Sequence, residues 1–167
     1  WEAGIELIEI KPERRSEGKS IDQLLNSEAI RIRAALTPRC LKVAMDECGK
    51  QLTTIELAEV IMAWMRNGRD IAFIIGGADG LDAEIKISAD EILSLSKMTL
   101  PHGLVRILLA EHLYRAVSLT KGHPYDRVTS FSDERLAWIR KQQDNSAVFL
   151  VVDEGPGRSG STFLSVA

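Results

Sequence analysis

A glycine-rich loop follows directly after a short apolar stretch and could bind a ligand through its main chain. The loop reads Gly76-Gly77-Ala78-Asp79-Gly80, and residues 71–75 before it are all apolar. In open parallel sheets, ligands bind beyond the carboxyl ends of the strands, and glycine lets a ligand approach the main chain. A tight turn between a strand and a helix explains the loop equally well. Its spacing matches neither the dinucleotide fingerprint nor a Walker loop, which disfavours a nicotinamide or ATP site.

A second candidate is the segment LSKMTLPHG over residues 95–103, which leads into the longest helical pattern of the chain. Free amide groups at the start of a helix can hold an anion or a carboxylate. Hydroxyl groups and apolar side chains of this segment could surround a flat ring, namely those of Leu95, Ser96, Met98, Thr99 and Leu100. A histidine at a helix start, such as His102, is more often a local cap or a surface residue than a catalytic group.

Charged and aromatic side chains on and after this helix form a third candidate group. They are Arg106, Glu111, His112, Arg115, Lys121, His123, Tyr125 and Arg127. Because Glu111 and Arg115 are four residues apart, the simplest interpretation is an ion pair on a helix surface. The cations and the tyrosine could instead form a local patch that contacts the phosphates and bases of a nucleic acid.

The elements that must position these groups alternate between strand and helix patterns. Strands are predicted over residues 5–10, 41–46, 71–75 and 91–96, and a helix over 104–119. Further helices are predicted after Ser20 and Thr53, since each is followed three residues later by the Gln or Glu of a capping box. The run 71–75 lacks polar alternation, as a strand buried on both faces of a parallel sheet requires. This order predicts an α/β fold with a doubly wound parallel sheet.

The composition fits one ordinary domain and excludes several classes of protein. The 167 residues are 45% hydrophobic and 27% charged, which is sufficient for an apolar core. No apolar run is long enough to span a membrane, and no signal-peptide pattern opens the chain. Cys40 and Cys48 lack the spacing of a metal site or a disulfide framework, so a cytoplasmic location and no metal are expected. The net charge of −3 excludes bulk attraction to nucleic acid but permits a local basic patch.

Three strings of residues between 73 and 127 together resemble one known family. They are FIIGGADGLD, LSLSKMTLPHGLVRILLAEHLYRA and GHPYDR, with weaker similarity through VAMDECGK back to WEAGIELIEIK at the start. The family is that of the bacterial SPOUT-class 23S rRNA (pseudouridine-N3)-methyltransferases. The resemblance covers residues 1–127, about three quarters of the chain.

The resemblance implies a parallel-sheet SPOUT fold with a C-terminal trefoil knot, which is a rare exception to unknotted chains. It also implies a homodimer, S-adenosylmethionine (SAM) as cofactor, and methyl transfer to N3 of a pseudouridine in 23S rRNA of the assembled ribosome. The cofactor contacts of the family fall on Met45, Gly76, Gly77, Leu95, Ser96, Lys97, Met98, Thr99 and Leu100. The catalytic candidates are His102, Arg106, Tyr125 and Arg127, and the substrate-binding candidates are Arg115, His123, Tyr125 and Arg127.

The chain departs from the family pattern in three places. It opens at Trp1, so we expect the first strand and helix of the family to be missing. The family ending His-Pro-Tyr-His-Arg is replaced by His123-Pro124-Tyr125-Asp126-Arg127, which removes a histidine near the expected substrate. Residues 128–167 then follow as a segment appended to the methyltransferase domain 1–127.

The appended segment predicts a helix after Ser132 and a strand over 147–152, followed by an acidic and Gly/Ser/Thr-rich loop over 153–162. This order resembles a fragment of a phosphoribosyltransferase, in which acids contact ribose hydroxyls and loop amides hold a phosphate. A helix–strand pair is not independently stable, so we expect the tail strand to fill the place of the missing first strand. A gene fusion or assembly artefact, with the tail merely carried along, is the other interpretation.

Three functions are therefore open to test. The first is a SAM-dependent rRNA methyltransferase. The second is a catalytically impaired knotted domain that binds a nucleotide or RNA without methylating it. The third is a phosphoribosyl-ligand module in the tail that uses Asp153, Glu154 and residues 159–162.

Overall fold

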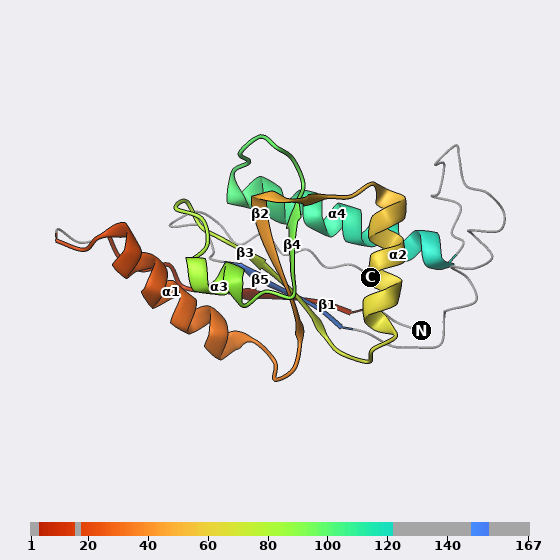
Figure 1. Cartoon of the computed structure of the whole chain (residues 1–167), viewed down its shortest axis with the longest axis horizontal. Helices are drawn as coiled ribbons and strands as arrows, with labels where there is room; N and C mark the ends of the chain where they lie inside the picture. The colour runs from red at the N-terminus through yellow and green to blue at the C-terminus, as the bar shows by residue number, and fades with distance from the viewer. Residues whose placement is uncertain (1–3, 16–17, 122–147, 154–167) are drawn as a thin grey trace.

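One parallel sheet organises the chain (Figure 1). The computed structural model describes residues 4–15, 18–121 and 148–153. The strands are β1 (Gly4–Glu9), β2 (Leu41–Gln51), β3 (Ile71–Ile75), β4 (Glu91–Ser94) and β5 (Val148–Asp153), in the spatial order β1-β5-β3-β2-β4. The helices are α1 (Ile21–Ala35), α2 (Thr54–Met65), α3 (Ala83–Ile87) and α4 (His102–Lys121). The predicted α/β class with a parallel sheet is confirmed.

Helices cover both faces of this sheet, and a separate apolar core fills each side. On one side α2 and α4 pack against the sheet around Phe73, Leu109 and Leu113. On the other side α1 and α3 pack around residues such as Ile74 and Ile85. Every residue of β3 is buried, because its side chains alternate between the two cores. The interpretation of residues 71–75 as a strand buried on both faces is confirmed.

Both predicted capping boxes are present and fix the starts of α1 and α2. The Ser20 hydroxyl accepts from the Gln23 amide at 3.3 Å, and the Gln23 side-chain oxygen accepts from the Ser20 amide at 3.1 Å. Thr53 and Glu56 exchange the same two bonds at 3.2 and 2.7 Å. These reciprocal bonds satisfy amide groups that a helix start otherwise leaves without a partner.

The structure corrects several of the predicted boundaries. The second strand extends beyond residue 46 to Gln51, because Lys50 and Gln51 pair with β4 again after an irregularity that follows Met45. The strand predicted over 91–96 ends at Ser94, whose hydroxyl donates to the Ser96 carbonyl at 2.7 Å and closes a turn. The short helix α3 was not predicted. Its signal in the sequence is Asp82, whose carboxylate accepts from the Glu84 amide at 2.8 Å and caps the helix.

The tail strand β5 lies inside the sheet, between β1 and β3. Ile5 is aligned with Phe149, and Phe73 with Val151. Among the described residues, β5 is the only strand that pairs with β1. The strand begins one residue later than predicted, at Val148. That it fills the place of the family's first strand stays a prediction, as does the knot. The predicted helix after Ser132 and the loop from 154 onward lie outside the described residues.

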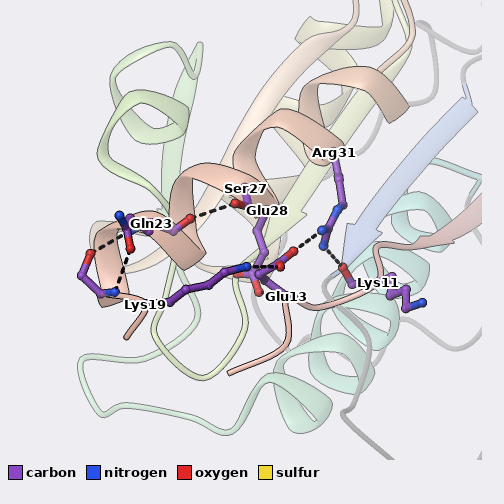
Figure 2. A network of polar contacts seen from close by, with 8 residues as sticks. Lys11, Glu13, Lys19, Gln23, Ser27, Glu28 and Arg31 are labelled. Carbon is purple, nitrogen blue, oxygen red and sulfur yellow. Dashed lines mark hydrogen bonds and ion pairs between the residues drawn. The ribbon is translucent and has the colours of Figure 1, made fainter. Parts of the chain in front are cut away.

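A polar network attaches the segment after β1 to α1 (Figure 2). The Glu13 amide donates to the Glu28 carboxylate at 2.8 Å, and the Glu13 carboxylate accepts from Lys19 at 2.7 Å and from Arg31. Arg31 also donates to the Lys11 carbonyl at 2.7 Å. The hydrogen bonds from Lys19 and Arg31 hold the pKa of Glu13 below its usual value. Arg15 of the same segment donates to the Asp79 carboxylate at 2.6 Å, so the segment lies beside the glycine loop.

In the part of the chain that is described, no helix has the length and apolar character needed to cross a membrane.

Candidate cofactor-binding site

A cleft of about 750 Å³ opens where β3 and β4 end, beside the irregular middle of β2. Residues 45–48 of β2, the glycine loop after β3 and the loop between β4 and α4 form its walls. The two loops that the sequence analysis singled out therefore face the same cavity, at the carboxyl edge of a parallel sheet where ligands usually bind. Eight of the nine predicted cofactor contacts line it, namely Met45, Gly76, Gly77, Leu95, Ser96, Met98, Thr99 and Leu100.

Lys97 is the predicted cofactor contact that does not line the cleft. The Ser96 hydroxyl accepts a hydrogen bond from the Met98 amide at 3.0 Å, which bends the chain into a tight turn. Lys97 is the central residue of that turn and is exposed. The local turn therefore separates Lys97 from neighbours that do line the cavity.

The glycine loop brings bare main chain to the cleft wall. A Cβ atom on Gly76 would lie 2.5 Å from the Gly80 carbonyl carbon, so no other residue fits there without moving the loop. The Gly80 amide donates to the Gly77 carbonyl at 3.1 Å, and Gly80 has a φ of 83°. The two interpretations of this loop are thus compatible, because a tight turn also forms the wall of a cavity.

One hydrogen bond joins two walls of the cleft. The Thr99 hydroxyl, from the loop before α4, donates to the Glu47 carboxylate at 2.6 Å, from the irregular part of β2. Gly49 permits this irregular part to lie against β4, since a Cβ atom there would be 2.6 Å from the Leu93 carbonyl carbon. Glu47 was not among the predicted site residues. It directly follows the strand predicted over 41–46, and that position indicates a place at the carboxyl edge of the sheet, where ligands bind.

Among the described residues that line the cleft, three carboxylates accompany one lysine, and two of the three are ion-paired. Asp46, Glu47 and Asp79 are the carboxylates and Lys86 is the lysine, while Asp79 pairs with Arg15, from outside the cleft, at 2.6 Å. Lys86 lies 2.8 Å from the Asp46 carboxylate, which also accepts from the Cys48 amide at 3.0 Å. The bond from Lys86 and then that from Cys48 hold the pKa of Asp46 below its usual value. Glu47 is thus the lining carboxylate that has no ion pair among the described residues, and together with the apolar wall it suits a ligand that has a flat apolar part and a cationic part.

The Asp46–Lys86 pair predicts a specific dependence of stability on pH. A carboxyl group whose pKa is lowered by folding contributes stability above the pKa of the unfolded chain, about 4, and loses it as pH falls through the lower folded value. We expect Asp46→Asn to lower the free energy of unfolding by about 1 kcal/mol at pH 6. Urea unfolding measures this free energy, and the difference between Asp46→Asn and the original chain should shrink toward zero near pH 2.

The control for this prediction is Glu84→Gln. Glu84 pairs with Arg33 at 2.8 Å, but 77% of the Glu84 side chain is exposed. We therefore expect little change in stability from this variant at any pH. An Asp46→Asn difference that stayed constant from pH 6 to pH 2 would contradict the assignment of a lowered pKa to Asp46.

The structure separates the predicted catalytic and substrate-binding residues. His102, the first residue of α4, lines the cleft. Arg106 pairs with Glu9 of β1 at 3.1 Å, outside the lining. Arg115 pairs with Glu111 at 2.7 Å on the exposed surface, as predicted for an ion pair between residues four apart on a helix. It lies thirteen residues beyond His102, about 20 Å along the helix. His123, Tyr125 and Arg127 lie outside the described residues.

Comparisons with known proteins match most of the chain. Residues 2–126 match the family model described as "Predicted SPOUT methyltransferase". A protein of Nitrosospira multiformis is 64% identical over 126 residues, one of Nitrosomonas eutropha 60% and one of Burkholderia ambifaria 56%. Each alignment covers 75% of this chain and 81% of the relative, and each relative is named ribosomal RNA large subunit methyltransferase H. These matches do not support the resemblance of the tail to a phosphoribosyltransferase. Over the matched residues, the chain belongs to the SPOUT methyltransferase family.

Proposed function

We propose that this chain transfers the methyl group of SAM to N3 of a pseudouridine in 23S rRNA of the assembled ribosome. The observation that carries the proposal is the single cleft that the glycine loop and residues 95–100 form in a SPOUT family member. The names of the relatives add that those proteins are methyltransferases of large-subunit ribosomal RNA. We further infer a cytoplasmic location, where ribosomes are found, and a knotted C-terminal part of the domain.

The residues of the cleft fit SAM in shape and charge. Met45, Leu95 and Leu100 supply apolar surface for the adenine ring, and the main chain of Gly76 and Gly77 forms part of the cleft wall. Glu47, which has no ion pair among the described residues, favours the positive charges of the sulfonium and amino groups. When bound, SAM supplies a methyl group that the sulfonium makes electrophilic.

The protein's part in the reaction is to hold the target base in line with that methyl group. Positioning of this kind can supply much of the reduction of a reaction barrier. His102 lines the cleft, and we assign it the role of accepting the N3 proton or orienting the base. We assign Arg106, Tyr125 and Arg127 to orienting the nucleotide, and Arg115 and His123 to binding RNA. The ion pair of Arg106 with Glu9 ties the second turn of α4 to β1.

An exposed apolar face of α4 supports a homodimer. Leu104, Ile107 and Tyr114 are 42%, 55% and 39% exposed, and their spacing of three and seven residues places them on one side of the helix. Exposed apolar patches on helices commonly mark protein interfaces. We propose that this face pairs with a second copy of the chain.

Substitution of the central residue of this face tests the homodimer. We expect Ile107→Asp to convert the dimer to a monomer at micromolar concentration in sedimentation equilibrium, because a buried charge without a partner strongly opposes association. Ile30→Asp is the matched control, since Ile30 is a 59% exposed isoleucine on α1. The same mass for the original chain and Ile107→Asp would contradict the assigned interface.

Incorporation of labelled methyl groups into ribosomes that lack the modification tests the proposed activity. We expect incorporation into 23S rRNA that requires SAM, together with SAM binding by calorimetry. SAM binding without methyl transfer would instead favour a catalytically impaired RNA-binding domain. In that case Asp126→His, which restores the family's His-Pro-Tyr-His-Arg ending, should recover activity. Absence of SAM binding would refute the proposed function.

A further inference from the structure

A second, smaller cavity of about 370 Å³ lies beside the cofactor cleft, and none of the roles proposed above uses it. Four residues line both cavities: Met45, Leu93, Ser94 and Leu95. The remaining walls come from the segment between β2 and α2 and from α4. Its volume is at the lower end of the range for small-ligand sites and suits a group about as large as one nucleotide.

The lining divides into an apolar floor and a polar rim. Leu57, Leu93 and Leu109 are 7%, 6% and 1% exposed and form the floor. Lys50 of β2 and His112 of α4 lie on the rim. The Glu56 carboxylate also lines the cavity, and it is held in the capping box of α2, where it accepts from the Thr53 amide and hydroxyl. An apolar floor can hold the face of a nucleobase, whereas a lysine and a histidine at the rim can contact its phosphate.

The Lys50 side chain is available to contact a phosphate, whereas the amide groups at the start of α2 are already used. The capping box of Thr53 and Glu56 already satisfies that helix start. Within the described part of the chain, Lys50 forms no ion pair. The main chain of Lys50 is fixed, because it is aligned with Leu93 in the β2–β4 pairing. The sheet therefore fixes the position of the lysine backbone beside the cavity, and the charged side chain extends from there.

The smaller cavity lies next to the cleft in which the target base would be methylated, because the two share a wall. Proteins that modify a base in RNA act on unstacked nucleotides and hold neighbouring nucleotides by apolar and phosphate contacts. We propose that this smaller cavity binds a nucleotide next to the methylated one, with its base on the apolar floor and its phosphate at Lys50 and His112. This inference rests on the proposed function for the choice of RNA as the ligand.

Titration of the full chain with uridine 5′-monophosphate, followed by NMR, tests the cavity itself. We expect saturable shifts that include His112, with and without SAM present. Lys50→Gln should weaken binding about fivefold, because one charged contact to phosphate is lost, and Lys50→Arg should restore it. SAM affinity should be the same in all these variants. Lys42→Gln is the matched control, since Lys42 is in the same strand and lines neither cavity.

Binding of ribosomes provides the second arm of the test. We expect Lys50→Gln to raise KM for ribosomes with little change in kcat, and to reduce the slope of log affinity against log salt by about one. Failure of the nucleotide to bind, equal binding by Lys50→Gln, or displacement of the nucleotide by SAM would overturn the inference. Failure of the original chain to bind SAM or to transfer methyl groups would refute the proposed function and leave the nucleotide result intact.

Discussion

Removal of residues 128–167 is expected to abolish cooperative folding of the remaining chain. Among the described residues, β1 pairs only with β5, and β3 pairs with β5 along one of its edges. Without β5, the buried main chain of β3 would lose its hydrogen bonds on that side. Each buried group left without a partner costs about 1–3 kcal/mol, and several such groups together equal the typical stability of a domain, about 5–15 kcal/mol.

Circular dichroism and thermal unfolding provide the measurement for this truncation. The matched control is a chain that ends after Asp153 and so retains every pair of β5. We expect the control to unfold cooperatively, and we expect a synthetic peptide of residues 147–153 to restore part of the transition in the chain that ends at residue 127. An unchanged unfolding temperature after removal of 128–167 would show that the tail strand is not part of the sheet.

Gly77→Arg is expected to abolish SAM binding and methyl incorporation while the chain remains folded. Gly77 lines the cleft and is not among the glycines with positive φ, so an arginine there needs no left-handed backbone. The long side chain would then fill space that the cofactor needs. We expect affinity for SAM to fall by at least about a hundredfold, which corresponds to roughly 2.8 kcal/mol.

The control for Gly77→Arg is the same substitution at Gly103. Among the residues that the structure describes, none lies within 4 Å of a Cβ atom on Gly103, and Gly103 is not in the described lining of the cleft. Gly103→Arg should therefore bind SAM as the original chain does. Calorimetry measures the affinity, and thermal unfolding shows that both variants are folded. Equal SAM affinity of Gly77→Arg and the original chain would refute the assigned pocket.

Much of the fold was predictable from the sequence because it depends on neighbours in the chain. A capping box needs only residues three apart, and Ser20 and Thr53 therefore marked the starts of two helices. The apolar run 71–75 indicated a strand buried on both faces, and the strand–helix order indicated a parallel sheet. The two loops of the cleft were also predictable, because the carboxyl ends of parallel strands meet at one edge.

Only the tertiary structure decided which distant residues meet. Arg106 contacts Glu9, 97 residues away, instead of lining the cleft, and Thr99 contacts Glu47 across the cavity. The place of β5 between β1 and β3 likewise follows from pairing across most of the chain. Local patterns in the sequence determine helix and strand propensity, and helix capping, over a few residues. Contacts between distant segments depend on how all the elements pack together, which no single segment of the sequence specifies.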